Sequence, residues 1–258
     1  MLCRLCKQTG KFTKSHIIPE AFFRELRIEK MSPTRISNTV GMFPKRSPIG
    51  VYDQEILCEE CEPKFSTMDD YGIKVLLKER DQLFEPVIDS AGREIASQSK
   101  AVDQHLLLVF LIGTLWRASV SKSDFFKRIE LGPYEEKARQ VVLNQASNIP
   151  KIFAAVLTKW STTDENQYIA RSIMDPILET NRSPNRYRFY FGEIVAYIKV
   201  DQREFEPQLK VYALCVQEQL TLGNRDFGGS KEFRLMQRVA AQSHANQWAA
   251  KTKLGRPK

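Results

Sequence analysis

Two short segments, Cys3-Arg4-Leu5-Cys6 and Cys58-Glu59-Glu60-Cys61, decide how the N-terminal part of this chain folds. Each segment has the spacing with which a tight turn presents two sulfur atoms to the same side of a metal ion. Together they supply four soft ligands, and we expect them to bind one structural zinc ion tetrahedrally. A redox motif would use a single pair beside a βαβ pattern, and iron–sulfur ligation needs other spacings. The predicted ligands are Cys3, Cys6, Cys58 and Cys61.

A zinc ion of this kind stabilises the folded form by an apparent ~10–16 kcal/mol, which lets a small module with little core fold. The fifth cysteine, Cys215, lies in the apolar stretch Val211–Val216. We therefore expect Cys215 to be a buried structural thiol.

Composition places the chain among packed globular proteins, because 42% of its 258 residues are apolar and 27% are charged. The longest apolar run, Leu106–Trp116, is interrupted by Gly113 and is too short to cross a bilayer. The N-terminus lacks the apolar core of a secretory signal. We expect a cytoplasmic protein without a membrane partner.

The formal net charge of +8 is unevenly distributed. Residues 1–50 carry ten Lys or Arg against three Glu, whereas residues 51–70 carry one Lys against seven Asp or Glu. A basic segment facing an acidic cluster is typical of a metal-assisted enzyme acting on a polyanion. Ordinary solvated faces of a basic protein explain the same distribution equally well.

The sequence predicts an α+β fold in two parts: a zinc-stapled module over residues 1–80 and an α+β accessory domain over residues 81–258. In the first part we expect strands at 11–18 and 51–57, helices at 20–29 and 63–79, and a loop at 31–50. In the second part we expect a polar connection at 80–100, helices at 102–121, 133–145 and 231–250, strands at 152–160 and 209–217, a hairpin at 186–200, and a basic C-terminal tail.

The residues between the cysteine pairs resemble the HNH branch of the ββα-metal (His-Me finger) nucleases. The resemblance rests on Ser15-His16-Ile17-Ile18-Pro19, on Asp53, and on Glu62 directly after the fourth cysteine, and it covers about residues 3–70. Many members of that branch carry a four-cysteine zinc that staples a β-hairpin to a helix. The resemblance therefore implies an N-terminal ββα-metal module followed by the second domain.

The resemblance also implies roles for individual residues. His16 matches the general base, Asp53 stands where the family has an orienting asparagine, and Glu62 stands where a histidine or asparagine binds the catalytic metal. This chemistry suits phosphodiester cleavage, because a neutral imidazole can activate water and a carboxylate is a good ligand for Mg²⁺ or Mn²⁺. The expected nucleic-acid contacts are Lys14, Arg24 and Lys64.

The chain departs from the family at Ser15, where an aspartate usually binds metal. Two interpretations stay open: a variant site in which Glu62, with Asp53 or Glu20, carries the metal, or a scaffold without activity. The first predicts an HNH-type endonuclease that hydrolyses DNA, and fold-level analogy associates it with bacterial or phage defence, as a homo-oligomer or in a larger complex. The alternatives are a non-catalytic zinc module that binds nucleic acid or a protein partner, and a purely structural subunit.

Other features favour ordinary packing. We expect His105, His244 and the pair Trp116-Arg117 to be structural. The hairpin aromatics Tyr187, Phe189, Tyr190 and Phe191, interleaved with Arg186 and Arg188, are more typical of a sheet core than of a single-strand binding surface. The tail Gly255-Arg256-Pro257 matches the core of minor-groove AT-hook peptides and should attract phosphates.

Overall fold

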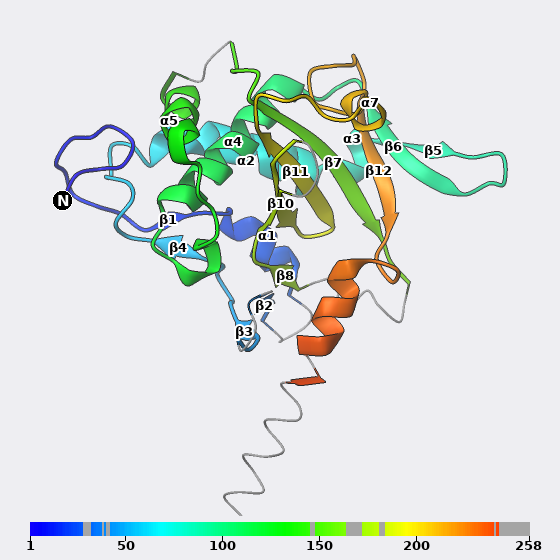
Figure 1. Cartoon of the computed structure of the whole chain (residues 1–258), viewed down its shortest axis with the longest axis horizontal. Coiled ribbons are helices and arrows are strands. Elements are labelled where there is room, and N and C mark those ends of the chain that lie inside the picture. The colour runs from blue at the N-terminus through cyan, green and yellow to red at the C-terminus, as the bar shows by residue number, and fades with distance from the viewer. Residues whose placement is uncertain are drawn as a thin grey trace, which may run out of the picture.

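The computed structural model describes residues 1–27, 32–37, 39, 42–144, 148–163, 172–180, 184–239 and 241–242. These residues contain both helices and sheets, which confirms the α+β class (Figure 1). None of the helices in the described ranges has both the length and the apolar character that crossing a membrane requires.

The N-terminal segment contains a minimal strand pair followed by a helix. Strand β1 (Ser15–His16) pairs antiparallel with β4 (Tyr52–Asp53), and α2 (Pro63–Ile73) follows the second cysteine pair. Helix α1 (Glu20–Glu25) begins directly after Pro19, as predicted. The strands are shorter than expected because pairing beyond them is reduced to one isolated bridge between Phe12 and Cys58.

Helix α4 (Gln104–Val120) is the central helix of the fold, and its bounds match the prediction. The Asp103 carboxylate caps it by accepting a hydrogen bond from the Leu106 N–H at 3.0 Å. Every residue from 107 to 118 is buried, so this helix is apolar on all sides. It packs against α2, against α5 (Glu135–Asn144), and against two strands of the main sheet.

Glycines let α2 and α4 approach closely. A Cβ atom at Gly72 would lie 2.6 Å from ring carbons of Phe110, and a Cβ atom at Gly113 would lie 2.9 Å from the Met68 sulfur. Both separations are shorter than side-chain packing tolerates. The contact between α2 and α4 therefore depends on the absence of side chains at these two positions.

The main sheet has seven strands in the order β5-β6-β12-β7-β11-β10-β9, all antiparallel except the parallel pair β12–β7. Its strands are β5 (Glu85–Ile88), β6 (Glu94–Ser99), β7 (Phe153–Ser161), β9 (Ile177–Glu179), β10 (Arg186–Phe191), β11 (Ile194–Val200) and β12 (Leu220–Asp226). Helix α4 contacts the two central strands β7 and β11.

The hairpin predicted at 186–200 is confirmed as β10 and β11, and its turn uses Gly192 at φ +65°. Its four aromatic side chains are all buried, so they belong to the sheet core and do not form a binding surface. The interleaved cations are neutralised locally: Arg188 pairs with Glu179 and Glu232, and Arg186 pairs with Glu179.

Two expectations for the second part were wrong. Residues 80–100 form helix α3 (Arg80–Leu83) and the β5–β6 hairpin instead of a polar connection. Residues 209–217 form the end of α7 (Pro207–Lys210) and a series of turns, with a single bridge between Val156 and Ala213. The strand that joins the sheet in this part of the chain is β12. The sequence did not predict it, because its pairing with β6 and β7 is non-local and leaves no local signal.

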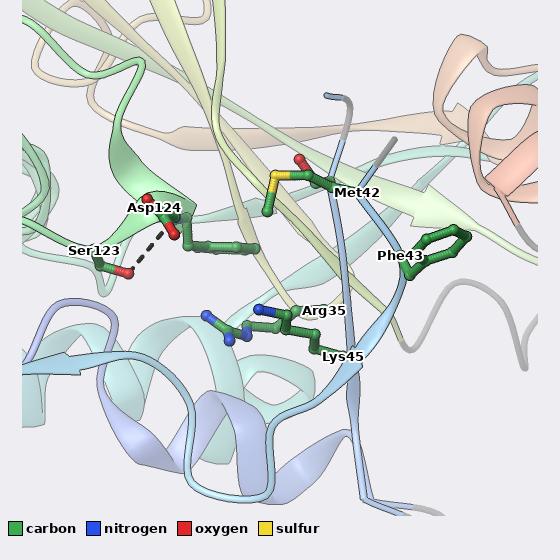
Figure 2. A pocket seen from close by; sticks show the side chains of 8 residues that line it. Arg35, Met42, Phe43, Lys45, Ser123 and Asp124 are labelled. Carbon is green, nitrogen blue, oxygen red and sulfur yellow. Dashed lines mark hydrogen bonds between the residues drawn. The ribbon is translucent and has the colours of Figure 1, made fainter. Parts of the chain in front are cut away.

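The predicted loop at 31–50 also contains strands. Strands β2 (Thr34–Ile36) and β3 (Lys45–Arg46) form a small sheet with β8 (Ile173–Met174). Arg35 and Lys45 are direct cross-strand partners and line a pocket of about 140 Å³ (Figure 2). The prediction failed because β2 pairs in parallel with a strand far away in the sequence.

Cys215 is exposed, which contradicts its expected burial. Its backbone adopts φ +65°, as in a turn, so the apolar stretch around it does not continue into the sheet. The C-terminal helix covers residues 231–239 and 241–242. The remainder of that predicted helix, His244 and the basic tail lie outside the described residues.

One hydrophobic cluster runs from Cys3 and Leu5 to Leu222. It contains buried residues of α2, such as Phe65 and Met68, together with α4 and the main sheet. Residues from both sides of position 80 therefore belong to this cluster.

The close approach of α2 and α4 generates a stability prediction. Gly72→Ala should destabilise the protein by about 1–3 kcal/mol, although alanine is the better helix former, because its methyl group must displace the Phe110 ring. Urea unfolding measures the change. The matched control is Gly223→Ala, where a Cβ atom meets nothing within 4 Å and which should change stability little. Equal stabilities of the two variants would contradict this packing.

Candidate functional site

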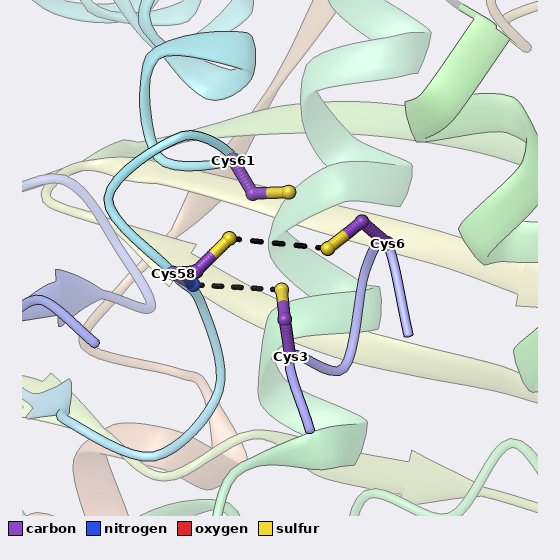
Figure 3. Close-up of side chains that lie close together, drawn as sticks. All are labelled: Cys3, Cys6, Cys58 and Cys61. Carbon is purple, nitrogen blue, oxygen red and sulfur yellow. Dashed lines mark hydrogen bonds between the residues drawn. The ribbon is translucent and has the colours of Figure 1, made fainter. Parts of the chain in front are cut away.

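The four predicted cysteines converge. Their sulfur atoms all lie within 4.8 Å of one another, and they come from two segments more than fifty residues apart (Figure 3). The Cys6 and Cys58 sulfurs are 3.9 Å apart. This cluster could hold one metal ion.

Each Cys-x-x-Cys segment forms the tight turn that the spacing predicts. In the first, the Lys7 N–H donates to the Cys3 carbonyl at 3.0 Å, and Lys7 has φ +63°. In the second, the N–H groups of Cys61 and Glu62 both donate to the Cys58 carbonyl. The two turns therefore fix the sulfur positions through backbone hydrogen bonds.

The sulfur positions fit a tetrahedral thiolate site. Four sulfurs at the usual zinc–sulfur distance of about 2.3 Å are roughly 3.8 Å apart, close to the observed separation. The Cys58 N–H also points at the Cys3 sulfur at 3.4 Å, as an N–H does toward a metal-bound thiolate. Burial would raise the pKa of Cys3, but backbone N–H groups outweigh it and lower this pKa to about 7. Burial raises the pKa of Cys61.

The cysteine cluster anchors the strand pair. The Thr13 N–H donates to the Leu57 carbonyl at 3.2 Å, next to the bridge between Phe12 and Cys58. In the strand pair itself, Ser15 lies opposite Asp53 and His16 lies opposite Tyr52. The structure thus brings two short strands and α2 together next to the cysteines.

A buried polar cluster lies between β1, α2 and α4. The Arg117 side chain, from α4, donates two hydrogen bonds to Asp69 at 2.7 and 2.6 Å and lies over the Phe65 ring. Glu62 lies two turns before Asp69 on the same face of α2. Ser15 is fully buried and faces Glu62.

The electrostatics of this cluster centre on Glu62. Burial raises the pKa of its carboxyl group, against the opposing effects of the Ser15 hydroxyl and the Arg117 charge. Among the described residues, Glu62 Oε2, Ser15 Oγ and Arg117 Nε are buried without a hydrogen-bond partner. Unpartnered buried polar atoms are costly, so their gathering here favours a site that binds water or a ligand.

His16 occupies the other face of β1, because adjacent strand residues point to opposite sides. Its Nε2 is 3.8 Å from a Glu20 oxygen, and its ring meets the Tyr52 ring edge-on. Burial, followed by the charge of Lys14, lowers the pKa of His16 below its usual value. The imidazole is therefore neutral near pH 7, as a general base requires.

The Asp53 side chain is hydrogen-bonded to the segment that follows α4. Its carboxylate accepts hydrogen bonds from the Ser121 hydroxyl and the Lys122 N–H, both at 2.9 Å, and from the Glu55 N–H. These contacts join β4 to the end of α4. Only the backbone of Asp53 supports β1, through its pairing with Ser15.

The three predicted cationic contacts lie on the surface around this site. Lys14 is exposed with its ammonium 4.2 Å from the centre of the Tyr52 ring. Arg24 pairs with Glu20 at 2.9 Å, and Lys64 is exposed in the first turn of α2. The exposed groups are available to a polyanion, although Arg24 is partly neutralised.

Sequence reasoning missed a second cationic surface beside the site. The Ser123 N–H donates to Ser121, which bonds Asp53, so the pocket of Figure 2 adjoins the strand pair. Arg35 lies over the Phe125 ring in this pocket, opposite Lys45. Like charges on paired strands oppose folding. The available signal was the placement of Arg35, Phe43 and Lys45 within one short segment, which the loop prediction hid.

Comparison of the chain with models of known protein families, with curated proteins and with solved structures finds no match. The relationship to HNH nucleases therefore stays a prediction from the residues themselves.

Removal of one predicted ligand tests the metal centre. Cys58→Ser should lose bound zinc and lower the melting temperature. The variant removes one of the four sulfurs with which the two turns would bind the ion. Metal analysis and thermal unfolding measure the two effects. Cys215→Ser is the control, since that exposed thiol lies outside the cluster. A Cys58→Ser protein that is metal-free and as stable as wild type would contradict a structural role.

Proposed function

We propose that this chain is a metal-dependent endonuclease of the HNH type that hydrolyses phosphodiester bonds in DNA. The proposal rests on two groups beside β1: the His16 imidazole on one face of the strand, and the Glu62 carboxyl group, which faces Ser15, on the other. The positive charge of Arg117 acts on both groups. His16 is a neutral imidazole, and Glu62 is a buried carboxyl group with one oxygen that has no hydrogen-bond partner among the described residues. The cysteines bind a structural zinc ion that holds this arrangement together.

In the proposed reaction, the His16 imidazole removes a proton from a water molecule while the water oxygen attacks phosphorus. The bond from phosphorus to the leaving oxygen breaks, and that oxygen takes up a proton from solvent. Glu62 would hold a Mg²⁺ or Mn²⁺ ion, which would supply Lewis-acid stabilisation of the charge on the phosphate. Glu20, beside His16, favours the protonated imidazole as it forms.

The basic surface supports a nucleic-acid substrate. Lys14 and Lys64 are exposed near the candidate residues, and Arg35 and Lys45 line the adjoining pocket with Phe43 and Phe125. Cations track phosphates, and an exposed aromatic side chain such as Phe43 can stack on a base. A like-charged strand pair loses its repulsion when a phosphate lies between the two charges.

The second candidate is a zinc module that binds nucleic acid without cleaving it. Ser15, where the family has a metal-binding aspartate, favours this alternative. In this alternative the basic surface and the cysteine metal centre keep their roles, and His16 does not act as a general base.

Cleavage assays separate the two candidates. Wild type should nick plasmid DNA with Mg²⁺ or Mn²⁺, and His16→Gln should lower the rate about 10²–10⁴-fold, the usual contribution of a general base. Glu62→Gln should lose most activity and require more metal. Lys100→Gln, at an exposed position before α4, is the control and should cleave as wild type.

Zinc content and melting temperature must be unchanged in His16→Gln, so that loss of activity is not loss of fold. DNA binding without cleavage by wild type would support the second candidate. Undiminished cleavage by His16→Gln would rule out the assigned base.

The pH dependence provides a further prediction. Activity should fall as pH decreases through the lowered pKa of His16, because the protonated ring cannot accept a proton. Lys14→Gln should move this acidic limb to higher pH, since removing the Lys14 charge raises the His16 pKa. A pH–rate profile for each protein measures the shift. An acidic limb at the same pH in both would contradict the electrostatic assignment.

A further inference from the structure

A cavity of about 460 Å³ is lined by residues between His105 and Val216, and none of the four clustered cysteines is among its lining residues. It is bounded by the first turns of α4, by β7 and β11, and by the segment around α7. Its volume lies in the range of small-molecule sites. Its apolar wall consists mainly of Leu108, Phe153, Phe205, Ala213 and Leu214.

The polar part of the lining carries excess positive charge. Three lysines, Lys151, Lys199 and Lys210, line the cavity against one carboxylate, Glu204, which pairs with Lys210. Two of the cations are therefore not neutralised by an acidic group of the lining. A concave apolar surface with convergent cations is complementary to an organic anion.

Lys199 has the environment of an organised binding group. The residue is 3% exposed, and its ammonium donates to the carbonyls of Lys151 at 2.7 Å and Asp201 at 2.6 Å. An ammonium has three N–H donors, and these two carbonyls are its partners among the described residues. The fixed ammonium thus has a donor left for a ligand, at no further cost in side-chain ordering.

A second polar atom in the lining also lacks a partner. His105 Nε2 is buried without a hydrogen bond among the described residues, although the ring borders the cavity. A buried ring nitrogen without a partner is costly unless a ligand or water satisfies it. His105 and Lys199 reach the same cavity from different elements, α4 and β11.

We propose that this cavity binds a small organic anion, whose carboxylate or phosphate contacts Lys151 and Lys199 and whose apolar body packs on Leu108, Phe153 and Phe205. The site is separate from the candidate nuclease site. His105 lies at the start of α4 and Arg117 near its end, twelve residues and about 18 Å further along the helix.

Isothermal titration of the full chain with 1-naphthoate tests the proposal, because this probe joins a carboxylate to an apolar body that fits the volume. The structure predicts saturable 1:1 binding. The neutral analogue 1-naphthalenemethanol should bind more weakly by a factor of about ten or more, since it lacks the charge that the lysines recognise. Equal binding of the two probes, or no saturable heat with 1-naphthoate, would overturn the proposal.

Two variants locate the binding. Lys151→Glu reverses an exposed charge and should weaken 1-naphthoate binding about tenfold or more, whereas Ala154→Leu should block the apolar part without changing charge. Lys127→Glu, at an exposed position outside the cavity, is the matched control for charge. Binding that is unchanged in both cavity variants, or weakened equally in the control, would place the anion elsewhere. The titration does not depend on nuclease activity, so either proposal can fail alone.

Discussion

The convergence of four sulfur atoms is the constraint on which the N-terminal structure depends. Strands β1 and β4 contribute only two residue pairs, which is far too few to persist in water by themselves. The turns at Cys3–Lys7 and Cys58–Glu62 hold the two strands in register, and a shared metal would make that register a property of the folded chain. Ser15 faces Glu62 next to the second cysteine turn, and His16 lies on the opposite face of β1.

The second constraint is the pair formed by Arg117 and Asp69. A fully buried guanidinium needs a well-oriented partner, and Asp69 provides it with two hydrogen bonds. The pair fixes α2 against α4 and places a positive charge near both His16 and Glu62. Structural packing and the chemistry of the candidate site therefore use the same residue. The glycine contacts at Gly72 and Gly113 make this close helix pairing sterically feasible.

Sequence reasoning was most successful where the signal was local. The convergence of the four cysteines, the helices α2, α4 and α5, and the β10–β11 hairpin follow from spacing, from apolar periodicity and from a turn glycine. It failed for β2 and β12, which pair with β8 and with β6 and β7 far away along the chain, and for Cys215, whose apolar neighbours border a turn. It also missed β3 and β6, the sheet neighbours of β2 and β12. The role of Arg117 was also invisible, because a buried ion pair with Asp69 leaves no pattern in a single sequence. The orientation of Asp53 toward α4 depends on tertiary contacts in the same way.

The central claim is that a single metal ion unites the two cysteine pairs within one chain. X-ray absorption spectroscopy of the purified, monodisperse protein, combined with metal analysis, tests it most directly. The account predicts one zinc ion per chain with four sulfur ligands at about 2.3 Å. Fewer than four sulfurs in the coordination shell, nitrogen or oxygen ligands in their place, or one zinc ion shared by two chains would contradict it.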